Sequence, residues 1–157
     1  MVSIKFPLVA LLYVIHVAAV PSFSSGYESN CPPYPVPATL QRQLFTSFVD
    51  LLYVRKNVTA AHETYVATNY INHNPFIPDG RDAAITALLP LVPIADIEIL
   101  HKLFDMGIGA VHMKVTFPGQ GPEAFVDIFR FNGSCIVEHW DVEEAVPKNA
   151  TSEHPLF

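Results

Sequence analysis

The chain has 157 residues, which is enough for one domain with one sizeable core. Half of the residues are apolar and 15% are charged, a composition that excludes an intrinsically disordered chain. The net charge is −6 and no basic block is present, so the sequence does not predict a nucleic-acid partner.

Residues 1–19 have the pattern of a secretory signal peptide. Lys5 precedes a nearly unbroken apolar run, and Val17 and Ala19 suit the −3 and −1 positions before a cleavage site. The apolar run is shorter than a membrane span usually requires. The alternative is a retained membrane anchor. We expect a secreted protein that has no membrane contact once the signal peptide is removed.

Two further features agree with secretion. Acceptor triplets for N-linked glycosylation begin at Asn57, Asn132 and Asn149. The sequence also holds two cysteines, Cys31 and Cys135, and an isolated pair in an oxidising compartment is predicted to form a disulfide. The alternative is two separate buried thiols.

A Ser- and Pro-rich lead-in over residues 20–37 is expected to be extended or irregular. It is followed by the predicted folded domain, residues 38–147. Apolar residues at helical spacing predict a first helix over residues 38–54. The polar residues 148–157 are expected to form a loose C-terminal tail.

Two shorter helices are predicted next. The first covers residues 59–66, with Thr59 as its N-cap. The second covers residues 81–92 and ends before Pro93, although Pro90 is expected to shorten or kink its last turns.

The second half of the chain predicts strands. Four runs rich in β-branched and aromatic residues cover 94–104, 108–117, 123–131 and 134–142, and Asn132-Gly133 is a strong hairpin signal. Helices followed by an antiparallel meander indicate an α+β fold. The helices must cover one face of the sheet, and we expect a ligand pocket between the two layers.

Asp127 is the first candidate for chemistry. Alternation along residues 123–131 places it on one strand face with Phe125, Phe129 and Phe131. An ionised carboxylate among aromatic rings is costly unless it is paired, and such an environment favours a general acid or base. The alternative is a structural aspartate that caps a loop amide or pairs with an arginine.

His139 and Asp141 form the second candidate pair, because residues two apart in a strand point the same way. A carboxylate beside an imidazole can fix its tautomer. The alternative is an ordinary surface pair at the end of a sheet.

Three more polar residues are candidates whose orientation the pattern leaves open. His112 lies either on the pocket wall or on a solvated face opposite the core. His73 and Asn74 are held in extended chain because Pro75 disfavours the helical region, and they either point into a cleft or form an Asx turn. A metal site formed by His73, His112 and His139 is a weaker alternative, since no ligand pair is set by local spacing.

Several short motifs occur in a fairly specific order and spacing. Together they resemble the SnoaL-like group of the NTF2-like superfamily, in the branch of predicted aldol-condensation or polyketide-cyclase-like proteins. The resemblance covers about residues 40–147, and Asn72 stands where that branch usually has Gln. The motifs are Tyr70-Ile-x-His73-Asn74-Pro75, Asp79-Gly-Arg81, Val111-His112, Val126-Asp127-Ile-Phe-Arg130 and Glu138-His139-Trp140-Asp141-Val142.

The resemblance implies an α+β cone with a deep pocket, no cofactor, and an acid/base residue that serves enolisation and aldol closure. We therefore expect a cofactor-independent lyase or isomerase that acts on a small carbonyl or polyketide-like metabolite. Asp127 is then the acid/base, His112 and His139 polarise the carbonyl or shuttle a proton, and Asp141 orients His139. The expected substrate-binding residues are Tyr70, His73, Asn74, Phe125 and Phe129.

The alternative function is a secreted protein that binds a small molecule in the same pocket without turnover. A curved sheet also exposes an outer face, and exposed apolar patches often mark interfaces. We therefore expect a homodimer packed through the sheet. The residues expected to include those lining that outer face are Val111, Met113, Val115, Ile136, Trp140 and Val142.

Overall fold

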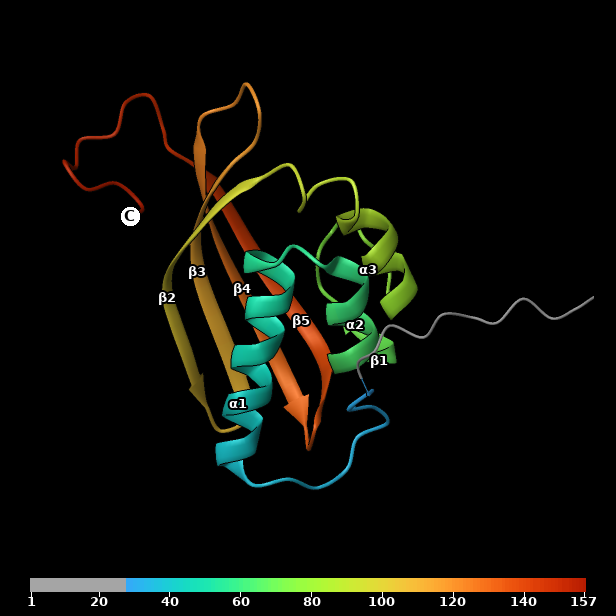
Figure 1. Cartoon of the computed structure of the whole chain (residues 1–157). Helices are drawn as coiled ribbons and strands as arrows, with labels where there is room; N and C mark the ends of the chain where they lie inside the picture. Colours follow the sequence, from blue (N-terminus) through green and yellow to red (C-terminus); the bar gives the residue numbers. More distant parts are fainter. Residues whose placement is uncertain (1–27) are drawn as a thin grey trace, which may run out of the picture.

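The computed structural model describes residues 28–157 (Figure 1). The predicted signal peptide and the first part of the predicted lead-in lie outside the described residues. Within them, no helix is long and apolar enough to cross a membrane. The elements are α1 (Ala38–Val49), the π-helix η1 (Asp50–Val54), α2 (Val58–Tyr65), β1 (Val66–Asn72), α3 (Arg81–Leu88), β2 (Asp96–Asp105), β3 (Ile108–Thr116), β4 (Pro122–Asn132) and β5 (Cys135–Ala145).

The strands form one curved sheet in the order β1-β5-β4-β3-β2. The β2–β3, β3–β4 and β4–β5 pairs are antiparallel, as predicted, whereas β1 pairs with β5 in parallel. The helices pack on one face of this sheet, with α1 lying along it (Figure 1). The predicted α+β class is therefore confirmed, and β4 lies at the centre of the sheet.

The first predicted helix is present but changes character near its end. α1 continues directly into η1, a five-residue π-helix. Its consecutive residues Leu51, Leu52 and Tyr53 are all buried. The wider turn thus allows the Tyr53 side chain to reach the interior beside the sheet. The third helix ends at Leu88 rather than at residue 92, and Pro90, which has no N–H to donate, follows closely.

Aromatic rings join the helices to the sheet. The rings of Phe48 on α1 and Phe129 on β4 have centroids 4.9 Å apart. Phe45 packs against β3 at Gly109, where an added Cβ would lie 2.5 Å from the Phe45 ring. The close approach of α1 to the sheet therefore requires glycine at this position.

The lead-in is attached to the sheet where β4 turns into β5. Cys31 and Cys135 form the predicted disulfide across a sequence separation of 104 residues. The backbone N–H of Tyr34 donates to Oγ of Ser134, and that hydroxyl donates to the carbonyl of Asn30. The predicted glycosylation acceptors Asn57, Asn132 and Asn149 are exposed, and their modification stays a prediction.

The predicted outer face of the sheet needs correction. In the sheet, Val111 pairs with Asp127 and Met113 pairs with Phe125. The side chains of Val111, Met113, Val115 and Ile136 are buried beneath the helices. These four residues belong to the more apolar face of the sheet, and the helices therefore cover that face. Trp140 and Val142 pair with Ile128 and Val126 on the opposite, outer face. A homodimer through that outer face stays a prediction.

Candidate functional site

A cavity of about 690 Å³ lies between the sheet and the helices. Most of its lining is apolar, including Leu88, Val92, Ile97, Met113, Val115, Phe117, Phe125 and Phe129. Eleven polar residues also line it, and we call eight of them the polar cluster. They are Tyr53, His62, Tyr70, Asn72, Asn74, Asp127, His139 and Asp141.

Asp127 lies at the centre of the polar cluster and is 7% exposed. Tyr53 donates a hydrogen bond to its Oδ2, and Nε2 of His139 lies 3.5 Å from its Oδ1. Burial raises the pKa of Tyr53 well above its ordinary value, and the neighbouring Asp127 raises it further. Tyr53 therefore keeps its proton and acts as a permanent donor to the carboxylate.

The tautomer of His139 is fixed by Asn72. The backbone N–H of Asn74 donates to Oδ1 of Asn72, which identifies this atom as the amide oxygen. Nδ1 of His139 lies 3.1 Å from the same oxygen and must therefore carry a proton. In the neutral ring Nε2 is then an acceptor, and it faces Asp127. The expectation that Asp141 orients His139 is wrong, because Asp141 accepts a hydrogen bond from the side chain of Asn74 instead.

Tyr70 presents an uncommitted hydroxyl to the cavity. The residue is 4% exposed and its ring stacks with that of His139. Burial raises its pKa above the ordinary value, and the carboxylates of Asp127 and Asp141 raise it further. Among the described residues, its hydroxyl has no hydrogen-bond partner. Tyr70 is thus a protonated donor that is available to a ligand.

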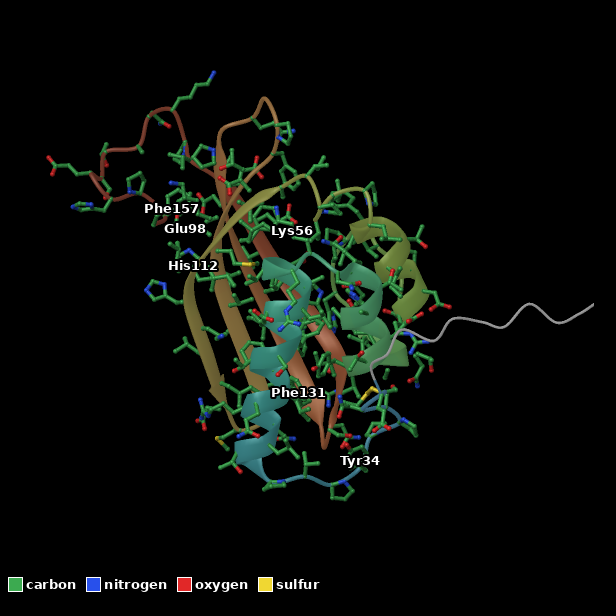
Figure 2. The ribbon with its side chains drawn as sticks, viewed as in Figure 1. Tyr34, Lys56, Glu98, His112, Phe131 and Phe157 are labelled. Carbon is green, nitrogen blue, oxygen red and sulfur yellow. A yellow bond between two sulfur atoms is a disulfide. The ribbon has the colours of Figure 1, made fainter. Side chains whose placement is uncertain are left out.

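The expectation that His112 lines the cavity is wrong. Val111 and Met113 point inward, so the period of two along β3 directs His112 to the outer face. There it lies beside His101, with the two Nδ1 atoms 3.2 Å apart. Figure 2 shows it on the part of the sheet near the C-terminal Phe157.

His73 is also outside the cavity. Its ring stacks on Trp140 with centroids 4.8 Å apart, and its Nε2 lies 2.8 Å from Glu138. The hydrogen bonds from His73 and Arg130 lower the pKa of Glu138. Asn74, the next residue, points inward to Asp141, and its neighbour in extended chain therefore points outward.

A metal site formed by His73, His112 and His139 is therefore excluded, since His139 points into the cavity and the other two do not. Among the described residues, Asp127, His139 and Asp141 are the group that could hold a metal ion, with ligand atoms within 4.8 Å of one another. Tyr53 and Asn74 each already engage one oxygen of the two carboxylates. A cofactor-free site stays a prediction, which metal analysis of the purified protein would test.

The structure thus brings together Asp127, His139, Asp141, Tyr70, Asn74, Phe125 and Phe129 from the predicted site. Sequence reasoning missed Tyr53, His62 and Asn72. Tyr53 lies in an apolar helical run whose pattern predicts a core position. His62 has no other potential ligand at metal-ligand spacing in the sequence. Asn72 could have been noticed in the sequence, because it stands where the resembled branch usually has Gln.

No family model matches the sequence, and no curated protein matches it. Solved structures do match. A candidate ketosteroid isomerase from Kribbella flavida superposes with a TM-score of 0.60 at 15% identity, covering 73% of this chain and 85% of that one. An NTF2-like protein of unknown function from Burkholderia xenovorans gives 0.59 at 16% identity, over 70% and 86% of the two chains.

The protein has the NTF2-like fold. A candidate polyketide cyclase from Acidithiobacillus ferrooxidans also superposes, with a TM-score of 0.53 at 14% identity over 69% of this chain and 91% of that one. At such identities the likeness concerns the NTF2-like fold alone. One fold hosts many activities, so the function has to be argued from the polar cluster.

Proposed function

We propose that this NTF2-like protein is a cofactor-independent acid–base enzyme, a lyase or isomerase, that acts on a small carbonyl compound. The observation that carries the proposal is the placement of Asp127. Its carboxylate is buried in a mostly apolar cavity, with Tyr53 donating to one oxygen and His139 near the other. Carboxyl groups in such surroundings are suited to proton transfer.

In the proposed reaction, Oδ1 of Asp127 takes a proton from the carbon next to the substrate carbonyl. Tyr70 donates a hydrogen bond to the carbonyl oxygen, where negative charge develops as the enolate forms. Nε2 of His139, which is an acceptor in the neutral ring, accepts the proton from Asp127 and returns it to the product. No proton is gained or lost over the cycle.

The size and lining of the cavity support a small, largely apolar substrate such as a polyketide-like metabolite. A volume of about 690 Å³ lies in the usual range for small-molecule sites. Phe125 and Phe129 line it, as does Met113. These side chains would contact the apolar part of the substrate, while the polar cluster would bind its carbonyl group.

The first step can be tested without knowing the natural substrate. We expect the protein to speed the exchange of the C2 protons of 1-tetralone into D₂O, followed by proton NMR. Asp127→Asn should lower that rate by about 10²-fold or more, the usual contribution of an acid/base group. Glu143→Gln, at a second carboxylate that lines the cavity, is the matched control and should keep most of the rate.

A binding protein without turnover is the second candidate, and the predominantly apolar lining of the cavity favours it. The same experiment decides between the two. If the wild-type protein binds 1-tetralone but does not raise the exchange rate above that of buffer, the enzyme proposal fails and the binding function takes its place.

A further inference from the structure

His62 is a member of the polar cluster to which the proposed reaction gives no role. It lies on α2, is 3% exposed, and lines the cavity. Its Nδ1 lies 2.9 Å from the backbone carbonyl of Val58. A carbonyl oxygen can only accept, so Nδ1 carries the proton and Nε2 carries the lone pair.

The lone pair on Nε2 has no partner among the described residues. Among the described residues, the side-chain nitrogen and oxygen atoms that are fully buried and lack a hydrogen-bond partner are Thr64 Oγ1 and Arg81 Nε. Nε2 of His62 also lacks a partner but is not in this group, so it is not fully buried. Nε2 therefore keeps an open side, and the cavity is the space that His62 lines. Burial lowers the pKa of His62 to about 4, so the ring is neutral at physiological pH. It offers an acceptor and not a charge.

His62 is connected to His139 through a series of aromatic contacts. Its ring lies 6.1 Å from that of Phe48, which contacts Phe129 at 4.9 Å. Phe129 in turn stacks on His139 at 4.8 Å. His62, Asp127 and His139 also line the same cavity, so a ligand that reaches Asp127 and His139 lies in the same compartment as the open nitrogen of His62.

We propose that His62 is a ligand-binding residue whose Nε2 accepts a hydrogen bond from a hydroxyl group, so that the cavity selects hydroxy-carbonyl compounds. The inference that the ligand carries a hydroxyl group rests on His62 alone. The inference that it carries a carbonyl group rests on the proposed function. A ligand hydroxyl loses water on entry and regains a hydrogen bond at Nε2. A ligand without it leaves a buried acceptor unpaired, and sites built this way discriminate strongly.

The competing explanation is structural. In that case His62 fills space beneath α2, is anchored to its own helix, and does not contact the ligand. Replacing it by an apolar ring of similar size would then change stability but not the ranking of ligands. Ligand ranking is therefore the measurement that separates the two explanations.

The test compares 1-tetralone with its 5-, 6- and 7-hydroxy derivatives, which share one apolar body and one ketone. Affinities are measured by calorimetry for the wild type, His62→Phe and His62→Gln. We expect at least one hydroxy derivative to bind the wild type about tenfold more tightly than 1-tetralone. His62→Phe should abolish that preference, and His62→Gln, whose amide oxygen can accept, should keep part of it.

His112→Phe is the matched control, because His112 lies on the outer face of the sheet and should leave the preference intact. Nitrogen-15 NMR of the histidine rings adds a direct readout. The Nε2 signal of His62 should shift with the preferred hydroxy derivative and stay in place with 1-tetralone.

The inference is overturned if no hydroxy derivative is preferred, or if the preference survives in a folded His62→Phe protein. It is also overturned if the Nε2 signal is unmoved by the preferred ligand. These outcomes concern binding only. A protein that binds hydroxy-tetralones through His62 but exchanges no protons would retain this inference and lose the proposed enzymatic function.

Discussion

Tyr53 and Asp127 are joined by a buried hydrogen bond although they lie 74 positions apart in the chain. The bond connects η1 with the central strand β4, and so it links the helical layer to the carboxylate in the middle of the cavity. Tyr53 donates to Oδ2, whereas Oδ1 is the oxygen that lies near Nε2 of His139. The helical layer therefore helps to orient the carboxylate.

Tyr53→Phe should destabilise the protein by about 1–3 kcal/mol, because it leaves a buried carboxylate oxygen without its donor. Urea unfolding followed by circular dichroism measures this change. The matched control is Tyr34→Phe. The exposed Tyr34 hydroxyl donates to Oδ1 of Asn30, and its loss should change stability by about 0.5 kcal/mol or less. Equal effects of the two substitutions would show that the Tyr53–Asp127 bond contributes nothing.

The sequence predicted most of the fold because its signals are local. Alternation, the Asn132-Gly133 hairpin and helical spacing lie within short windows, and the structure has the corresponding strands and helices. The strand β1 was missed for the opposite reason. Its residues 66–72 do not alternate in polarity, and its parallel partner β5 comes more than sixty positions later in the chain.

The site was predicted only in part, and the physical reason is again locality. His139 and Asp141 share a face because of their spacing along one strand. The inward or outward direction of His112 depends on which face the helices cover, and alternation alone does not decide that. The pairing of Asn72 with His139 depends on the unpredicted β1–β5 contact, so no local pattern could have shown it.

Asn72 should control the protonation pattern of His139 and thereby proton transfer. Nitrogen-15 NMR should show the Nδ1–H tautomer of His139 in the wild type. Asn72→Ala removes the acceptor and should lower 1-tetralone exchange by about tenfold or more. Asn72→Asp keeps an acceptor oxygen and should preserve the Nδ1–H signal. An unchanged tautomer and rate in Asn72→Ala would remove Asn72 from the proposed mechanism.

The disulfide between Cys31 and Cys135 should contribute much of the stability. A cross-link over about 100 residues is worth up to about 4.7 kcal/mol in the chain-entropy treatment, because it restricts the unfolded chain. The double variant Cys31→Ala/Cys135→Ala should therefore unfold at a clearly lower urea concentration. Wild-type protein treated with a reductant should behave alike. A double variant as stable as the oxidised wild type would contradict this expectation.

The neutral state of His62 should make stability depend on pH. The pKa of His62 is about 4 in the folded protein, whereas a histidine in an unfolded chain has a pKa of about 6.5. Between these values the unfolded chain binds a proton that the folded protein does not. The free energy of unfolding therefore falls as the pH falls from about 6.5 to about 4, by about 3 kcal/mol in total.

His62→Phe removes this titration, so the difference in unfolding free energy between wild type and variant isolates it from the carboxylates that titrate nearby in pH. We expect this difference to be constant above about pH 7 and to shift in favour of the variant as the pH falls to about 4. Urea unfolding at pH 7, 6, 5 and 4 measures it. Parallel profiles for the two proteins would mean that His62 is protonated as easily in the folded state as in the unfolded chain. The ring would then carry a charge at mildly acidic pH, and it would no longer be a neutral acceptor there.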